Sequence, residues 1–282
     1  MLIHDQAGNG LLIVASATSF QEMRWELARR LLDTEPFNAG KWQQLDVSGS
    51  DMHATYELLN VTVWYEMPVF YESAQEWIKP DLPWAEGHFQ ERVAGKAVNP
   101  GDWHDKWPYH AGKVELHQHG GKYDHNYMER FWPTDIVMDV DPGIEDRFSG
   151  YRFPVGDLDD VVKQLVDNPG TRQAYLPIFF PEDTGATQGQ RVPCTLGYHF
   201  IIRNGQLHVQ YNMRSCEIYR HFTNDVYMAT RLAHWVSNKF NQYVSLGVGD
   251  PNEIEVGQLT LNIVSLHGFV GDRYQIEGFQ NP

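Results

Sequence analysis

An Asn-Gly pair at Asn204-Gly205 constrains the fold of this 282-residue chain more than any other feature. Residues 206–213 alternate polar and apolar side chains, and β-branched and aromatic residues dominate 196–203. An Asn-Gly pair between two such runs is the strongest short-range sign of a β-hairpin, because both residues readily adopt positive φ. We therefore expect two antiparallel strands joined by a two-residue turn.

Periodicity and capping signals elsewhere predict further helices and strands. Ser19 followed by Glu22 is a capping-box pattern, which indicates the start of a helix that runs to Leu32. The stretch from about 68 to 134 is rich in aromatic residues and has little periodicity, so we interpret it as ordered loops and short helices. The remaining expected elements are strands over 10–16, 174–180 and 256–267, a helix beginning within 51–67, and helices over 157–168 and 225–241.

This order of elements fits an α+β layer fold better than a doubly wound parallel sheet. The length suits one large domain or two small ones, and no repeat or low-complexity tract divides the chain. We expect a single domain over residues 1–282, with the aromatic and histidine-rich stretch around 68–134 as an insertion.

Charge and cysteine content narrow the functional class. A net charge of −15 argues against a general nucleic-acid partner, whose binding surface would be basic. A few focused arginines can still bind a phosphorylated small molecule. Cys194 and Cys216 are the only cysteines, which is too few for a disulfide framework, so we expect a reducing cytoplasm. The apolar run near the N-terminus is too short for a signal peptide or a membrane span.

Cys194 and Arg214 flank the predicted hairpin, twenty residues apart. Pairing of the two strands places the thiol beside the guanidinium, which favours the thiolate and can also bind a phosphate. Ser215, directly after the arginine, adds a hydroxyl donor. Two plainer interpretations exist: an isolated cysteine is usually a small buried hydrophobe, and Arg214 can pair with Glu217 across the next turn.

These residues resemble the core of thymidylate synthases and the related nucleotide hydroxymethylases. That family has Pro-Cys, then Arg-Ser-x-Asp twenty residues after the cysteine, then asparagine eleven residues after the arginine. Cys194, Arg214 and Ser215 match without a gap, and Asp225 occupies the asparagine position. The resemblance covers residues 157–269 well. It implies a thymidylate-synthase-like fold, a large twisted mixed sheet flanked by helices, in a homodimer whose subunits pack back to back.

The resemblance also implies a reaction. Cys194 would add to C6 of a pyrimidine nucleotide, and C5 would then attack the one-carbon unit of 5,10-methylenetetrahydrofolate, the co-substrate. Arg214 and Ser215 would bind the phosphate, and Arg172 would reach from one subunit into the partner's site. Gln173 stands where the family has a second arginine, which removes one cation from that phosphate site.

Asp225 bears on the choice of base. Asparagine suits uracil because its amide donates to O4 and accepts from N3–H, whereas a carboxyl group accepts from the 4-amino group of cytosine and helps to protonate N3. Members of the family that hydroxymethylate cytidylates carry aspartate here. Two other interpretations stay open: Asp225 is a helix N-cap, or a one-residue shift makes Asn224 the base reader. The ungapped spacing from Cys194 to His234 favours Asp225.

Other positions match the family pattern less completely. Glu57 in YELLNV resembles a Glu-Leu-Leu helix whose glutamate organises water and proton transfer at the base; an exposed helical glutamate is the alternative. His267 resembles the histidine of a His-x-Tyr strand that binds the sugar 3′-hydroxyl, with Phe269 in place of the tyrosine. Glu217 replaces an aspartate that contacts the folate pterin. The aromatic candidates are Trp84 and Trp77, as stacking partners of the pterin, and Tyr127, which resembles a family tyrosine.

Five histidines between 104 and 125 raise the question of a metal site. His117 and His119 lie on one face if their segment is a strand, a spacing that some metal sites use. No cysteine or acidic ligand pattern accompanies them, so we predict no metal. The five are His104, His110, His117, His119 and His125.

The sequence therefore predicts transfer of a one-carbon unit to C5 of CMP or dCMP, giving a 5-hydroxymethyl nucleotide, with no membrane or nucleic-acid partner. The alternatives are a dUMP methylase or hydroxymethylase, and a non-catalytic nucleotide-binding relative. Only residues 270–282 follow the His-x-Phe strand, where the family carries a longer tail that closes over the folate. We expect a wetter site, in which water captures the exocyclic methylene before hydride transfer.

Overall fold

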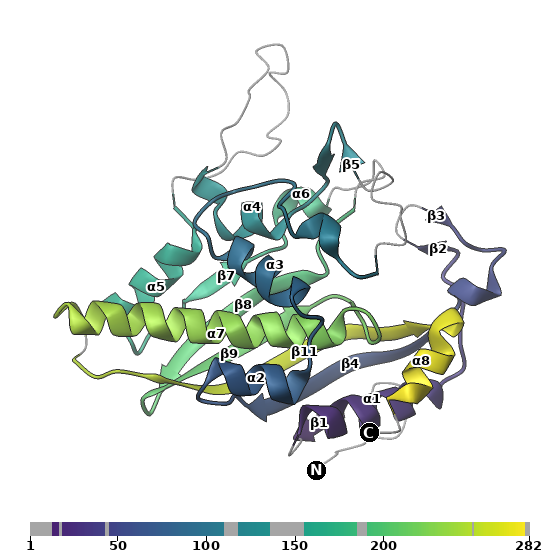
Figure 1. Cartoon of the computed structure of the whole chain (residues 1–282), viewed down its shortest axis with the longest axis horizontal. Coiled ribbons are helices and arrows are strands. Elements are labelled where there is room, and N and C mark those ends of the chain that lie inside the picture. The colour runs from purple at the N-terminus through teal and green to yellow at the C-terminus, as the bar shows by residue number, and fades with distance from the viewer. Residues whose placement is uncertain are drawn as a thin grey trace.

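The computed structural model describes residues 13–16, 19–42, 45–109, 118–135, 155–184, 191–249 and 251–279. Its centre is a seven-stranded mixed sheet, in which six strands run in the order β1-β4-β11-β9-β8-β7 and β10 pairs with β11 (Figure 1). These strands are β1 (Ile13–Ser16), β4 (Thr55–Glu66), β7 (Tyr175–Pro177), β8 (Thr195–Arg203), β9 (Gln206–Met213), β10 (Cys216–Glu217) and β11 (Glu255–Phe269). The mixed α+β class expected from the sequence is confirmed.

The predicted hairpin is confirmed as β8 and β9. Asn204 has φ of 54° and Gly205 has φ of 74°, so both residues of the turn are left-handed, as a two-residue type I′ turn requires. β8 and β9 are antiparallel, and β9 in turn pairs in parallel with the long strand β11.

The helix expected to begin within 51–67 is wrong. A single 3₁₀ turn, η1 (Asp51–His53), is followed by the twelve-residue strand β4. The residues of β4 are rich in β-branched and aromatic types, and buried ones such as Tyr56 and Val63 alternate along much of the strand with more exposed ones. Antiparallel pairing with β11 from Thr55 to Glu66 stabilises the extended form. Long-range pairing therefore outweighed the local helical signal.

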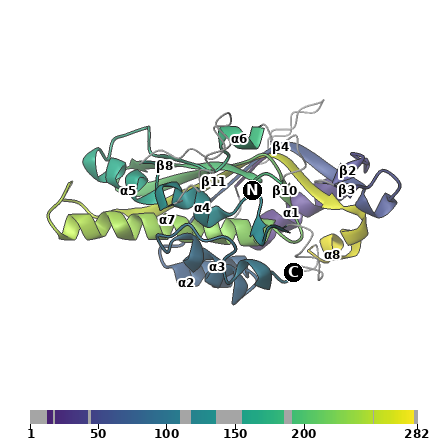
Figure 2. The same ribbon diagram turned by 90° about the horizontal axis from the view of Figure 1, so that it is seen from above.

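Helices cover one face of this sheet. Viewed from above, α7 (Phe222–Ser245), α2 (Tyr71–Ile78) and α3 (Trp84–Arg92) lie on one side of the strands, and α6 (Pro181–Thr184) lies on the other (Figure 2). The core fills the space between α7 and the sheet, with fully buried side chains such as Phe222, Tyr227 and Tyr211. The opposite face carries a polar ladder, in which Thr62 donates to Asn262 and Asn262 donates to Asn212.

The expected helices are confirmed with shifted ends. α1 (Phe20–Leu32) begins at the N-cap Ser19, whose side chain accepts from the Glu22 N–H. α5 (Leu158–Asp167) follows an Asp157 capping box. α7 begins three residues before the predicted start and ends four residues later. Burial along α7 explains its length, since most of its residues pack in the core.

The aromatic stretch forms short elements, as expected for its described residues. They are α2, α3, η2 (His104–Lys106), β5 (Gln118–His119), β6 (Lys122–Tyr123), α4 (Tyr127–Phe131) and η4 (Pro133–Asp135). The chain also contains β2 (Lys41–Trp42), β3 (Leu45–Asp46), η5 (Val270–Asp272) and α8 (Arg273–Gly278).

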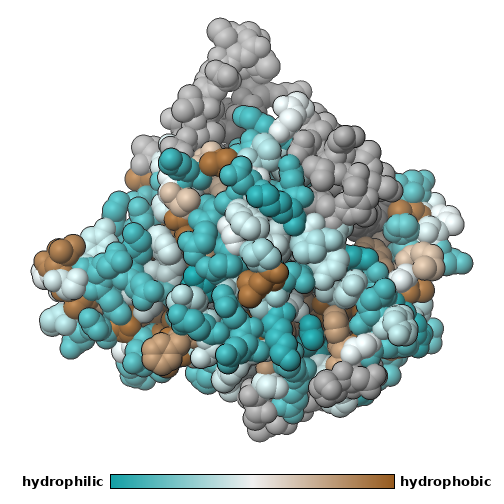
Figure 3. Space-filling model, viewed as in Figure 1, coloured by the Kyte–Doolittle hydropathy of each residue, from teal (hydrophilic) through white to brown (hydrophobic). Residues whose placement is uncertain are grey.

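The helical face is mainly hydrophilic, with apolar residues scattered over it (Figure 3). Among the helices that the structure describes, none is both long enough and apolar enough to cross a bilayer.

Candidate functional site

Cys194 and Arg214 face each other at the open end of the β8–β9 hairpin. Thr195 pairs with Met213, and the next position brings the Cys194 carbonyl to the Arg214 N–H at 2.9 Å. The guanidinium folds over the same segment, donating to the Pro193 and Val192 carbonyls at 2.8 and 3.0 Å, and lies 3.9 Å from the Cys194 sulfur. The predicted contact between thiol and cation is therefore present, and Arg214 does not pair with Glu217.

The Cys194 thiol reaches solvent, yet its pKa is raised above the ordinary value because surrounding protein desolvates it. Arg214 acts against this effect, as does Arg191. The arginines therefore lower the pKa of the thiol, as expected, but burial raises this pKa by more. His221 is likewise exposed, and burial among neighbouring groups lowers its pKa to about 3. Cys194 and His221 are therefore both exposed at the surface and partly desolvated by the protein around them.

Asp225 lies on α7 behind the cysteine. Burial raises the pKa of its carboxyl group from 3.8 to about 7, while Arg92 acts to lower it. The thiol of Cys216, its nearest described partner, lies 3.8 Å from the carboxylate. Asp225 also raises the pKa of the Cys194 thiol electrostatically, so the two side chains share one site. Near neutral pH, this carboxyl group can both give and take a proton.

Two alternative interpretations of Asp225 are wrong. The N-cap of α7 is His221, and Asp225 stands within the first turn of the helix rather than at the cap. Asn224 is 2 % exposed and engaged elsewhere, since its amide donates to the Asp81 carboxylate at 2.8 Å and its oxygen accepts from the Asp81 N–H. The fold therefore engages Asn224 with Asp81, whereas the charge of Asp225 acts on Cys194.

A chain of hydroxyl groups runs beneath the cysteine. Tyr127 hydrogen-bonds to Thr195 at 2.9 Å, and Thr195 hydrogen-bonds to Tyr211 at 2.8 Å. Burial raises the pKa of both tyrosines, so they remain neutral donors and acceptors. The sequence pointed to Tyr127 alone. Thr195 and Tyr211 carried no signal beyond their places in a strand.

Glu217 is 5 % exposed and its oxygens are engaged locally. They accept from the N–H groups of Tyr219 and Arg220 at 3.0 and 2.6 Å. Burial raises the pKa of this carboxyl group to about 7. Glu217 therefore holds the turn between β10 and α7, and its role toward a folate stays a prediction.

Glu57 is on a strand, and not on the helix that its resemblance implies. It stands opposite His267 in the register of β4 and β11, and it accepts a hydrogen bond from Ser265. His267 in turn lies 3.4 Å from the Ser215 hydroxyl through its Nδ1, and burial lowers its pKa to about 4. The structure thus groups Glu57 with His267 and Ser215, and no interaction within the described chain joins it to Cys194.

Arg172 lies at the edge of the sheet, between α5 and β7. Its side chain is exposed, and its backbone carbonyl bonds to the His199 ring at 2.9 Å. Within the described residues no hydrogen bond or ion pair holds its guanidinium. Its exposure agrees with a role toward a second subunit, which stays a prediction.

A second tryptophan, Trp107, lies beside Trp84 with ring centroids 6.4 Å apart, and the role of Trp84 toward a folate stays a prediction. Trp84 is 8 % exposed, donates to the Trp103 carbonyl at 2.8 Å and stacks on His88. Trp107 instead stacks on His221 at the start of α7, with ring centroids 4.7 Å apart. Trp77 is 45 % exposed on α2.

The histidine-rich stretch packs rather than clusters, as far as it is described. His104 stacks on Tyr123 with centroids 3.8 Å apart, and burial lowers the pKa of His125 to about 3. His110 and His117 lie outside the described residues, as does the side chain of His119. In the part of the chain that is described, no group of three or more His, Cys, Asp or Glu side chains is placed to hold a metal.

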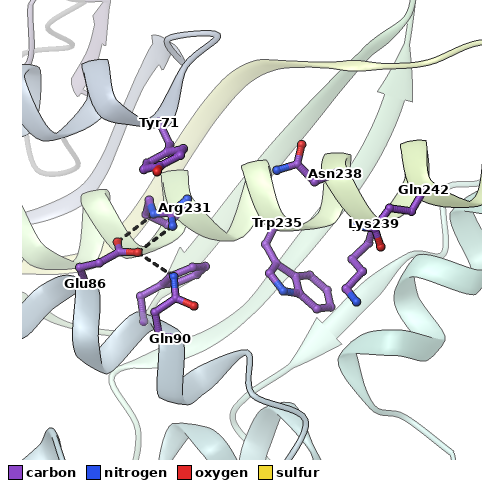
Figure 4. Close-up of a pocket in the computed structure, with 9 residues that line it drawn as sticks. Tyr71, Glu86, Gln90, Arg231, Trp235, Asn238, Lys239 and Gln242 are labelled. Carbon is purple, nitrogen blue, oxygen red and sulfur yellow. Dashed lines mark hydrogen bonds and ion pairs between the residues drawn. The ribbon is translucent and has the colours of Figure 1, made fainter.

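A cavity of about 310 Å³ lies elsewhere, between α2, α3 and α7. Figure 4 shows Arg231 at its wall, bound by Glu86 through two of its guanidinium nitrogens, with Trp235 and Lys239 further along α7. The arginine is already neutralised and no sulfur lines the cavity. The group of side chains around Cys194 is therefore the better candidate for a catalytic site.

Sequence reasoning missed Arg191 and Arg92. Arg191 stands three residues before Cys194, so proximity in the sequence was a usable signal. Arg92 comes from α3, about a hundred residues before the cysteine, and no motif singles it out.

Asp225 makes a prediction about stability. Asp225→Asn should gain stability relative to the wild type as pH rises from about 4 to about 7. In this window the unfolded carboxyl group has lost its proton while the folded one, with its raised pKa, retains it, so the wild type loses folding free energy. Denaturant unfolding at pH 4, 5.5 and 7 measures the difference, with the exposed Asp159→Asn as control. A difference that does not change with pH would contradict the raised pKa.

No family model matches this chain, and no curated protein matches its sequence. The functional conclusion therefore depends on the site itself, which combines a thiol, two arginines and a carboxyl group that titrates near neutral pH.

Proposed function

We propose that this protein transfers a one-carbon unit from 5,10-methylenetetrahydrofolate to C5 of CMP or dCMP and releases a 5-hydroxymethyl nucleotide. Cys194 is the nucleophile that adds to C6, and Asp225 contacts the base. Arg214, Ser215 and Arg172 bind the phosphate, and His267 binds the sugar. Glu217 and a nearby aromatic residue contact the folate, and Glu57 handles water and protons from its strand. The two unpaired cysteines suit a reducing cytoplasm, which we propose as its location.

One observation carries this proposal: Asp225, with a pKa of about 7, lies in electrostatic contact with an accessible cysteine. Addition of sulfur to C6 of cytosine places electron density on N3, which must then take up a proton. A carboxyl group that is partly protonated at neutral pH supplies that proton and accepts from the 4-amino group. A permanently ionised aspartate would accept from the 4-amino group but would have no proton to supply to N3.

The direct test incubates the protein with methylenetetrahydrofolate and CMP, dCMP or dUMP, each carrying tritium at C5. Tritium release with a cytidylate supports the proposal, and mass spectrometry identifies a hydroxymethyl or a methyl product. Absorbance reports dihydrofolate, which accompanies methylation only. Preference for dUMP would indicate a uridylate enzyme, and nucleotide binding without tritium release would indicate a non-catalytic relative.

The open face of the sheet supports the proposed homodimer. Helices α2, α3 and α7 lie on one side (Figure 2), and the polar ladder of Thr62, Asn262 and Asn212 alternates along the strands with buried residues such as Val63 and Ile263, which places it on the other face. A second copy placed against this face would form an isologous interface, in which each subunit contributes the same surface. Arg172, at the sheet edge with a free guanidinium, would then reach its partner's phosphate site.

Subunit complementation tests the position of Arg172. Cys194→Ser and Arg172→Ala should each reduce activity, and a mixture of the two, unfolded and refolded together, should regain roughly one quarter of wild-type activity. Half of the dimers in the mixture are heterodimers, and each has one site with both an intact cysteine and the partner's intact arginine. The same variants refolded separately and then mixed are the control. A refolded mixture with no more activity than this control would contradict a shared site.

A further inference from the structure

Arg92 differs from the other buried arginines of the described chain in its lack of a carboxylate partner. It is 4 % exposed, its Nε has no hydrogen-bond partner, and no described carboxylate forms an ion pair with it. Two other buried arginines are fully paired, since Arg130 binds Asp183 and Arg231 binds Glu86, each through two nitrogens. A buried donor such as this Nε is costly when it has no hydrogen-bond partner. Such a group indicates a partner that is supplied from outside the chain.

The contacts of Arg92 place it close to the segment that carries Cys194. Its guanidinium carbon lies 4.0 Å from the centre of the Tyr127 ring, and Tyr127 hydrogen-bonds to Thr195, directly after the cysteine. Its charge acts on Asp225, although no hydrogen bond joins the two side chains. Stacking on the tyrosine fixes the plane of the guanidinium and leaves its edge free to donate. A ligand between Arg92 and Asp225 would meet a donor on one side and a titratable carboxyl group on the other.

We propose that Arg92 is a base-reading residue, which donates to O2 of a cytosine ring while Asp225 contacts N3 and the 4-amino group. This assignment rests on the proposed function. The edge of cytosine presents two acceptors, O2 and N3, and one donor, the 4-amino group, which match a guanidinium beside a carboxyl group.

Arg92 would also stabilise the adduct. The sulfur electron pair forms the S–C6 bond, the C5–C6 π pair moves to C4–C5, and the C4–N3 π pair moves to N3, which takes the proton of Asp225. The proton lost by the thiol restores Asp225, so no further reactant is required. Charge that develops on N3 is shared with O2 through C2, where Arg92 donates.

Binding measurements with CMP and with ribose 5-phosphate isolate the base. Arg92→Met should weaken CMP binding about 10- to 100-fold, the usual loss for a hydrogen bond to a charged group. Ribose 5-phosphate, which has the sugar and phosphate but no base, should bind within about twofold of the wild type. Arg92→Lys keeps the charge without the planar fork and should fall between. Arg231→Lys is the matched control, because Arg231 is also buried and stacked on Tyr71 but lines the separate cavity between α2, α3 and α7.

Calorimetric titration at one pH gives each dissociation constant, and circular dichroism checks that each variant is folded. Unchanged CMP affinity in Arg92→Met, or an equal loss for both ligands, would overturn the assignment while leaving the proposed function intact. If the methionine variant does not fold, unchanged CMP affinity in Arg92→Lys has the same meaning. A wild-type protein that binds CMP no better than ribose 5-phosphate would overturn both the assignment of Arg92 and the proposed function.

Discussion

Cys194→Ser is expected to reduce turnover by at least about 10³-fold while nucleotide affinity stays close to that of the wild type. A serine hydroxyl is far harder to ionise than a thiol, and its oxygen is a poorer nucleophile toward C6. The side chain contributes little to the fold, because it is exposed and its sulfur has only a long 3.9 Å contact with Arg214, whereas the backbone of Cys194 accepts from the Arg214 N–H at 2.9 Å. The phosphate-binding arginines are untouched, so binding should survive.

Tritium release from C5 and calorimetric titration with CMP together measure this separation. Intact-protein mass spectrometry with a 5-fluorinated cytidylate adds a direct readout, since fluorine at C5 blocks proton loss and traps the adduct. Cys216→Ser is the matched variant, because it removes the other thiol, which is 2 % exposed, and should still form the adduct. Full activity in Cys194→Ser, or an adduct that requires Cys216, would refute the assigned nucleophile.

Asp225→Asn is expected to shift the ratio of kcat/KM for cytidylate over uridylate by about 10²-fold or more toward uridylate. The amide donates to O4 and accepts from N3–H, which uracil offers and cytosine does not. It also removes the proton that the carboxyl group, with its pKa of about 7, supplies to N3. Both effects act in the same direction, because cytosine loses a partner and a proton source together.

Glu217→Gln is the control for this change. Its carboxyl group also has a pKa of about 7, but its oxygens accept from the Tyr219 and Arg220 N–H groups, away from the base. It should leave the ratio between the two nucleotides unchanged. Steady-state kinetics with CMP, dCMP and dUMP on the three proteins provide the comparison. An unaltered ratio in Asp225→Asn would show that Asp225 does not contact the base.

Local signals were reliable where local chemistry decides conformation. The Asn204-Gly205 turn, the Ser19 cap and the Asp157 helix start all depend on interactions among near neighbours in the chain. The stretch 51–67 was mispredicted because its conformation depends on β11, about two hundred residues later. The same error affected Glu57, whose assigned role assumed a helix.

The sequence by itself determined that Cys194 and Arg214 lie close together at the open end of the hairpin, and a register shift between Thr195 and Gly197 then sets Arg214 opposite the cysteine. Only the tertiary structure decided what surrounds that pair. Packing of α3 against α4 and α7 brings Arg92 and Tyr127 together near the cysteine, and the start of α7 places Asp225 where its charge acts on the thiol while Asn224 binds Asp81. The pKa of Asp225 likewise arises from burial by distant segments. Desolvation depends on all the atoms that surround a group in space, so it cannot be predicted from the spacing of residues in the sequence.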